Sequence, residues 1–335
     1  MRKLATIRTI TEILPHTNAD NLSIAVVDGW KLVIKSGDFN VGDVVVYCEV
    51  DSFLPIKPEY EFLRKTSYKK MGDIEGFRLK TIRLRGEISQ GLLLPVTVLP
   101  EGVEYKYGDD VTDVLGILKY EPPIPANLSG EVKGSFPSFI PKTDEERVQN
   151  LRDYNRLRDN LYYVTEKIDG ASITIYYNQG TFGVCSRNLE LTDTENNSYW
   201  KVVKSQSIQE KLTEYCVREN KNLAIQGELH GFGIQKNIYA KTNQDLVIFT
   251  VFDIDNQTSY GLEAFKEICE NIGVNTVPIL DESFQLPPTV DELIRYADGK
   301  TIMNPSAQRE GVVIRTLDGK QSFKAISNEF LLKEK

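Results

Sequence analysis

The sequence predicts an α+β protein of two domains, a small β-barrel followed by a domain of antiparallel sheets with flanking helices. Residues 4–95 read as short strands without a long helical pattern, residues 116–140 are rich in proline and glycine, and residues 141–335 mix apolar strands with helical periodicities. A chain of 335 residues is long enough for two cores. We therefore expect a barrel domain over 1–115, a connector over 116–140 and a second domain over 141–335.

The barrel prediction rests on strand patterns in the first hundred residues. Residues 4–10 alternate, and residues 22–27 and 30–33 are joined by Asp28-Gly29, a two-residue hairpin signal. Three further segments, residues 43–50, 76–84 and 88–95, continue the pattern. Five or six short strands of this kind favour an OB-like barrel, a common unit in proteins that handle nucleic acid.

The charge balance bears on the class of partner. The net charge of −8 argues against wholesale coating of nucleic acid. Residues 64–85 nevertheless carry eight Lys or Arg residues against two acidic ones, with Tyr68 and Phe77 between them. Such a segment fits a face that follows a phosphate backbone, and a solvated barrel surface would look the same. Both interpretations stay open.

Several classes of protein are disfavoured by what the sequence lacks. No run reaches the roughly 18 apolar residues of a membrane span, and Met1-Arg2-Lys3 is not followed by an apolar signal core. We therefore expect a cytoplasmic protein without a membrane partner. Four scattered cysteines and two histidines argue against both a zinc site and a disulfide framework.

The second domain reads as alternating strands and helices. Thr143 and Glu146 have capping-box spacing, which predicts a helix start within residues 142–150. Strands are expected at residues 161–167, 172–177, 181–187, 223–228 and 246–254, and helices at 199–217, 261–272 and 289–296, the last capped by Thr289. Residues 309–315 and 322–326 should form a hairpin around Asp318-Gly319.

Lys167 is the candidate nucleophile of this domain. It ends an apolar strand and is followed by Ile168, Asp169 and Gly170. Burial and neighbouring cations lower an ammonium pKa, which frees the amine for attack on phosphorus or a carbonyl. The motif alone is weak, because a Lys-Asp pair on a hairpin is more often a surface salt bridge.

Charged side chains also stand at other strand ends. An arginine such as Arg187 suits a phosphate or ribose clamp, and Glu228 ends a second apolar strand. Asp253 is costly in its apolar strand unless it finds a partner, and Phe252 is either a core residue or a platform for a purine. The hairpin allows Glu310 and Lys324 to approach one cleft.

Taken in order, these segments resemble the signature of the covalent nucleotidyltransferase superfamily, which includes DNA ligases, RNA ligases and mRNA capping enzymes. The segments are Lys167-Ile168-Asp169-Gly170, Ser186-Arg187-Asn188, Gly227-Glu228, Phe252-Asp253-Ile254, Glu310-Gly311-Val312-Val313 and Lys324. The second and fourth favour the RNA ligase branch. With residues 86–91 and 142–150, nearly the whole chain resembles Deinococcus-type RNA ligases.

Two departures from the family pattern stand out. Members usually carry a second basic residue two positions after the lysine of the last motif, where this chain has Ile326, so that role is vacant or taken by Lys333. The sequence also stops soon after that motif, without the C-terminal OB domain of DNA ligases and capping enzymes, which counts against those two classes.

The resemblance implies ATP as cosubstrate and a Mg²⁺ or Mn²⁺ ion. Lys167 would attack the α-phosphorus to form a lysyl-AMP, helped by Lys324 and by an ion at Glu310, with Asp253 supporting the metal or the lysine. The remaining roles are nucleotide contacts: Arg187, Asn188 and Glu228 at ribose and phosphate, Phe252 on adenine, Glu166 at the adenine edge, Asp169 and Gly170 in the nucleophile motif, and Lys142, Arg147 and Gln149 toward the leaving pyrophosphate.

The implied function is ATP-dependent sealing of 3′-OH/5′-phosphate breaks. The expected partner is RNA in a nicked duplex, with an RNA 3′-OH strand on a DNA or RNA template. The sequence does not determine the oligomeric state, and we expect a monomer. The alternatives are a DNA nick ligase, a capping-type guanylyltransferase and a nucleic-acid-binding protein without catalysis.

Overall fold

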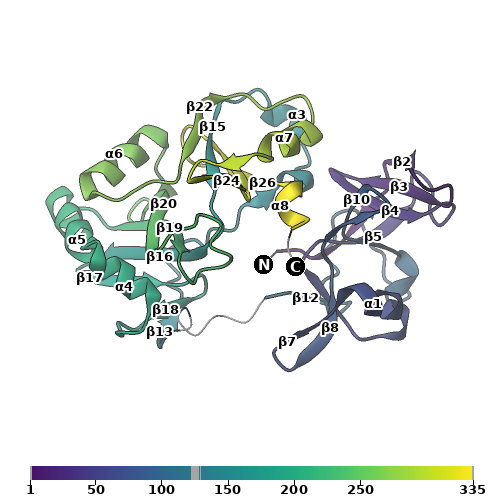
Figure 1. Cartoon of the computed structure of the whole chain (residues 1–335), viewed down its shortest axis with the longest axis horizontal. Coiled ribbons are helices and arrows are strands. Elements are labelled where there is room, and N and C mark those ends of the chain that lie inside the picture. The colour runs from purple at the N-terminus through teal and green to yellow at the C-terminus, as the bar shows by residue number, and fades with distance from the viewer. Residues whose placement is uncertain (1, 122–127, 129, 334–335) are drawn as a thin grey trace. The chain divides into compact units, whose positions relative to one another are not determined.

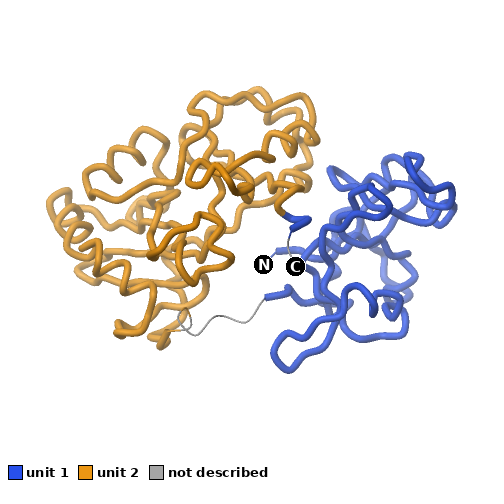
Figure 2. The backbone as a smooth tube through the Cα atoms, viewed as in Figure 1, with its two compact units in different colours: residues 1–123, 331–335 blue, residues 124–330 orange. Residues whose placement is uncertain are grey.

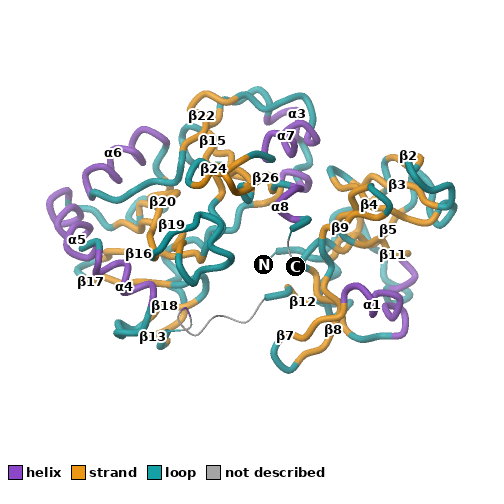
Figure 3. The backbone as a smooth tube through the Cα atoms, viewed as in Figure 1, coloured by secondary structure: helices purple, strands orange, loops and turns teal. Residues whose placement is uncertain are grey.

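The computed structural model describes residues 2–121, 128 and 130–333. The chain divides into two compact units, Met1–Pro123 with Leu331–Lys335, and Ile124–Phe330 (Figure 2). Each unit has its own sheets and its own hydrophobic clusters. The secondary structure of both is mixed, with strands predominating over helices (Figure 3).

The first unit is built from short antiparallel strands around two apolar clusters. One sheet has the order β1-β5-β11, a second β2-β3-β4, a third β12-β6-β8-β7, and β9 pairs with β10 (Figure 1). In β4 the side chains of Trp30, Leu32 and Ile34 are buried and alternate with more exposed neighbours, the period of two expected for a strand with one core face. The strands are β1 (Ala5–Thr9), β2 (Glu12–Pro15), β3 (Leu22–Val27), β4 (Trp30–Lys35), β5 (Val44–Cys48), β6 (Ser52–Pro55), β7 (Tyr68–Met71), β8 (Ile74–Arg78), β9 (Thr81–Leu84), β10 (Glu87–Gln90), β11 (Leu92–Pro95) and β12 (Leu118–Lys119). Short helices are η1 (Pro58–Leu63), α1 (Arg64–Ser67) and η2 (Val96–Val98).

Part of the expected connector takes part in sheets. Strand β12 pairs with β6, and β13 (Val132–Ser135) pairs with β18 (Leu189–Leu191) of the second unit. Residues 122–127 and 129 of the expected 116–140 connector lie outside the described residues.

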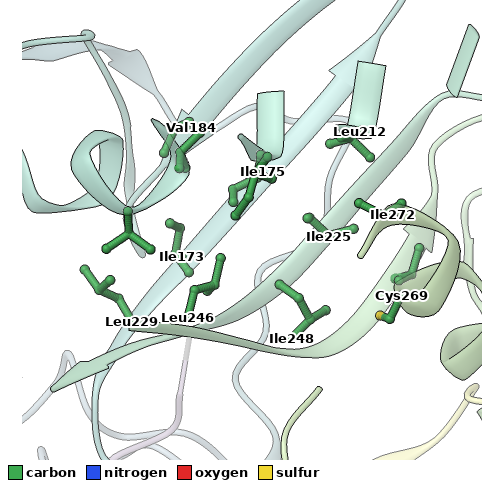
Figure 4. Packing of buried hydrophobic residues seen from close by; sticks show 14 of the residues in the cluster. Ile173, Ile175, Val184, Leu212, Ile225, Leu229, Leu246, Ile248, Cys269 and Ile272 are labelled. Carbon is green, nitrogen blue, oxygen red and sulfur yellow. The ribbon is translucent and has the colours of Figure 1, made fainter. Parts of the chain in front are cut away.

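A seven-stranded antiparallel sheet forms one half of the second unit, in the order β13-β18-β17-β16-β19-β20-β21. Helices α4, α5 and α6 cover one of its faces, where Ile173, Ile225 and Ile248 pack with helix residues such as Leu212 and Ile272 (Figure 4). The elements are β16 (Ala171–Asn178), β17 (Thr181–Cys185), β19 (Leu223–Gly231), β20 (Gln244–Asp253), β21 (Thr258–Ser259), α4 (Ser198–Ser205), α5 (Ile208–Glu219) and α6 (Leu262–Ile272).

A five-stranded sheet of order β14-β26-β25-β15-β22 forms the other half. The expected hairpin is present as β25 (Gly311–Thr316) and β26 (Ser322–Ile326), and the side chain of Thr289 caps α7 (Val290–Ala297) by accepting the N–H of Glu292 at 3.2 Å. The other elements are β14 (Glu146–Arg147), β15 (Tyr162–Lys167), β22 (Ile279–Phe284), β23 (Lys300–Thr301), β24 (Asn304–Gln308), η3 (Val148–Asn150), α3 (Tyr154–Leu157) and α8 (Asn328–Leu331).

Two of the predicted helices need correction. The helix predicted from Thr143 and Glu146 is absent, and the segment instead runs extended into β14, which pairs in parallel with β26. Ion pairs made by Asp144 and Glu145 with distant cations outweigh the local capping preference. The helical pattern over 199–217 is divided into α4 and α5 at Ser207, whose backbone is left-handed at φ 52°. Within the described residues, no helix is long and apolar enough to cross a membrane.

Candidate active site

Lys167 occupies the last position of β15, an inner strand of the five-stranded sheet. The register aligns Lys167 with Gly311 on β25, and Thr165 with Val313, which is in turn aligned with Lys324 on β26. Because residues two apart on a strand share a face, Lys167, Thr165 and Lys324 lie on one face of this sheet. The strand register therefore brings the predicted nucleophile, Lys167, close to Lys324, the lysine of the last motif.

Carboxylates surround the Lys167 amine. Its Nζ lies 2.8 Å from both carboxylate oxygens of Glu310, which immediately precedes β25. Burial alone would lower the Lys167 pKa, but the charges of Glu310, Glu228 and Asp169 outweigh it and raise the pKa above its ordinary value. The expectation of a depressed pKa is thus wrong for the free protein, in which Lys167 is an ammonium ion.

Glu228 lies on β19 of the seven-stranded sheet and reaches the same place from the opposite side. Burial raises its pKa to about 8, opposed by the nearby charge of Lys167. A Cβ added at Gly170 would stand 2.4 Å from the Leu229 carbonyl oxygen and 2.7 Å from Cγ of Glu228. Only glycine permits this close approach of the nucleophile turn to β19.

A second cluster of charges surrounds Asp144. Its carboxylate pairs with Lys324 at 3.0 Å and with Arg187, which follows β17, at 2.9 Å. Burial lowers the Lys324 pKa to about 8, Asp144 opposes this shift, and the nearby cations Lys167 and Arg147 add to it. The structure thus brings cations from two distant parts of the chain to one carboxylate.

The other predicted phosphate contacts border this cluster. Lys142 donates to the side-chain oxygen of Asn188 at 3.0 Å. Arg147 on β14 is buried and is aligned with Lys324 on β26, and Gln149 lies buried in η3 directly after it. Lys142 is thus tied to the residue after Arg187, and Arg147 lies on the strand beside Lys324.

Glu166 and Ile326 are both buried. Glu166 is buried, burial raises its pKa, and it accepts the backbone N–H of Ile302 at 2.9 Å. Ile326 is buried and is aligned with Gly311, so the position where the family usually has a second basic residue holds no charge here. Lys333 belongs to the other compact unit.

Asp253 and Phe252 are not brought to Lys167. Asp253 is aligned with Leu223, five residues before Glu228 and therefore roughly 16 Å along β19 from it. Its carboxylate accepts hydrogen bonds from the Asn256 N–H and amide and from the Tyr260 hydroxyl, so it is satisfied as a turn cap. Phe252 is buried with Tyr176 and Ile254 and is only 4% exposed. The metal-binding role predicted for Asp253 and the stacking role predicted for Phe252 both conflict with this placement.

Phe249 is a further aromatic side chain near the nucleophile turn, and the sequence interpretation missed it. The register of β19 and β20 shifts between Gln226 and Gly227, which leaves Phe249 as the extra residue of a β-bulge. Phe249 is half-buried beside Ile168, the residue after Lys167, and the Arg315 guanidinium lies 5.6 Å from its ring centroid. A one-residue bulge has no signature in an apolar run, so no sequence signal could have singled Phe249 out.

The residues around Lys167 suit a hard divalent cation whose remaining ligands are water molecules and substrate phosphates. Glu310, Glu228 and Asp169 supply oxygen donors near the Lys167 amine. Among the described residues no three acidic, histidine or cysteine side chains form a ready-made metal cage. Magnesium-type ions fit such a site, because they retain waters and use one or two carboxylates with substrate phosphates.

Comparisons with known proteins agree with this geometry. A family model described as RNA ligase matches residues 160–326, and one described as an OB-fold domain matches residues 4–96. A search of curated proteins finds no match.

Solved structures of an RNA ligase from Naegleria gruberi match the whole chain. A point mutant with ATP and Mn is 43% identical, with a TM-score of 0.93 and 99% of each chain covered. Another mutant, with AMP and Mn, is 42% identical with a TM-score of 0.94 over 99% of each chain. The structure with PPi is 42% identical with a TM-score of 0.93, covering 100% of this chain and 99% of that one.

Proposed function

The chain belongs to the RNA ligase family, and we propose that it seals nicks whose 3′-OH strand is RNA, with Lys167 as the adenylylated nucleophile. ATP-dependent RNA ligation through an adenylylated intermediate is the activity of this chain. The assignment of Lys167 rests on the surroundings of its amine. The charges of Glu310, Glu228 and Asp169 act on it, and Lys324 lies on the same face of the sheet.

In the first step the Lys167 amine attacks the α-phosphorus of ATP. A P–N bond forms, the bond to the bridging oxygen breaks, and pyrophosphate leaves. The ammonium must first lose a proton, and Glu310 at 2.8 Å is the group placed to accept it. A bound Mg²⁺ or Mn²⁺ would supply positive charge that compensates the phosphates and the three carboxylates.

The cations around Asp144 are the proposed binding site for the triphosphate. Lys324 and Arg187 would exchange the Asp144 carboxylate for phosphate oxygens, and Arg147 and Lys142 would orient the leaving pyrophosphate. The AMP would then pass to the RNA 5′-phosphate, and attack by the 3′-OH would form the phosphodiester and release AMP.

For the base and ribose we propose contacts from both sheets. Phe249, in place of Phe252, would pack against the purine, since it is half-buried against the cluster that contains Ile168, the residue after Lys167. Glu228 would hold the ribose. Glu166 would contact the adenine edge, a role that rests on the family resemblance alone.

The first test is covalent labelling by α-labelled ATP with Mg²⁺ or Mn²⁺. We expect label on the wild type that survives denaturation and none on Lys167→Ala, because Lys167 is the proposed nucleophile and the variant lacks its amine. Labelling by GTP or NAD⁺ in place of ATP would move the assignment to a sister family. A complete absence of label, with strand binding kept by Lys167→Ala, would favour a binding protein.

The second test concerns the strand that is sealed. Nicked duplexes with RNA or DNA on the 3′-OH side, each on an RNA or DNA template, separate the proposal from a DNA nick ligase. Sealing should require RNA on the 3′-OH side; equal sealing of an all-DNA nick would overturn that part of the proposal.

A further inference from the structure

The loop between β19 and β20 holds the nucleophile turn at two backbone positions. The Tyr239 hydroxyl accepts the backbone N–H of Asp169 at 2.6 Å, and the side-chain amide of Gln235 donates to the Gly170 carbonyl at 3.0 Å. Both contacts join a loop of residues 232–243 to the turn that follows Lys167.

Tyr239 is itself fixed in place. Its side chain is 3% exposed and packs with Ile168, and its ring meets His230 edge-on with 5.2 Å between centroids. The side-chain amide of Asn304 donates to the Ile238 carbonyl at 2.7 Å, which holds the chain beside the tyrosine. Burial raises the Tyr239 pKa, so the hydroxyl stays neutral.

We propose that Tyr239 is a positioning residue for adenylyl transfer, which fixes Lys167 in line with the α-phosphorus through the Asp169 N–H. This inference rests on the proposed role of Lys167 as nucleophile. In-line attack tolerates little error, since a misplacement of about 1 Å can cost on the order of a hundredfold in rate. Without Tyr239, the turn after the nucleophile loses its buried hydrogen-bond acceptor.

Tyr239→Phe separates positioning from packing, because it keeps the ring against His230 and Ile168 and removes only the acceptor. The readouts are single-turnover formation of lysyl-AMP, and sealing of a nick whose 5′ end already carries AMP. The second reaction bypasses attack by Lys167. We expect lysyl-AMP formation to slow by about tenfold to a hundredfold, with the half-saturating ATP concentration unchanged and sealing of the adenylylated nick close to the wild-type rate.

Tyr162→Phe is the matched control, since Tyr162 is a buried tyrosine on the same strand as Lys167 whose hydroxyl donates to the Leu157 carbonyl at 2.7 Å. It should lose hydroxyl contacts without slowing lysyl-AMP formation. Equal losses of both reactions in Tyr239→Phe would show a structural role only, and wild-type rates of both would show no role. A wild type that forms no lysyl-AMP would instead refute the proposed function.

Discussion

At the scale of single residues, the charge on Lys324 depends on pH within the working range of an enzyme. Burial lowers its pKa to about 8, so Lys324 is a cation below that pH and becomes neutral above it. A neutral amine no longer attracts the triphosphate. We therefore expect the Kd of a non-reacting ATP analogue to rise by about tenfold per pH unit once the pH exceeds 8, measured by calorimetric titration.

Two variants check the cause of this pH dependence. Glu228, with a pKa raised to about 8, gains negative charge in the same range, so its repulsion of the triphosphate should add to the tenfold rise expected from Lys324. Lys324→Arg keeps its charge at all these pH values, so its profile should be shallower than that of the wild type. Asp144→Asn should move the Lys324 contribution to lower pH, because Asp144 raises that pKa. A Lys324→Arg profile as steep as the wild type would contradict the assignment.

At the scale of elements, the bulge in β20 supports the proposal that Phe249, and not Phe252, packs against the purine. Phe249→Ala should weaken ATP binding by about 1–3 kcal/mol, the usual worth of a base stacked on an aromatic ring. Phe252→Ala should instead lower the free energy of unfolding by about 3–5 kcal/mol, because Phe252 is buried in a core cluster. Thermal unfolding and ATP titration on both variants measure the two effects, and a larger loss of ATP affinity in Phe252→Ala would restore the original assignment.

The elements also show which features the sequence could predict. The paired strands, helix α6, the Thr289 cap of α7 and the hairpin that carries Glu310 and Lys324 follow from local patterns, and the strand register brings the motif residues together. The distance of Asp253 from Lys167 could not be predicted, because a motif match does not say how far along a strand the site lies. The extended conformation around Asp144 could not be predicted either, because its partner Lys324 is 180 residues away and no local rule describes such a contact.

At the scale of the whole molecule, residues 64–85 of the first unit form a basic segment that is a candidate for contact with the RNA backbone. Three of its cations have acidic partners: Arg64 pairs with Glu61, Lys70 with Glu75 and Arg78 with Asp51. In the described part of the chain, the exposed Lys65 and Lys69 show no such pairing. These two side chains are therefore available to neutralise phosphates.

We predict that Lys65→Gln/Lys69→Gln binds nicked RNA duplex more weakly at low salt, while lysyl-AMP formation keeps its wild-type rate because Lys167 and its neighbours lie in the second unit. Each lost phosphate contact should reduce the slope of log K against log salt by about 0.9, so the double variant should lose up to about 1.8. Lys201→Gln/Lys211→Gln, on exposed positions of α4 and α5, is the matched control for total charge. If both double variants change the slope equally, the effect comes from net charge alone and the basic segment is a solvated surface; if only the first does, unit 1 contacts the RNA.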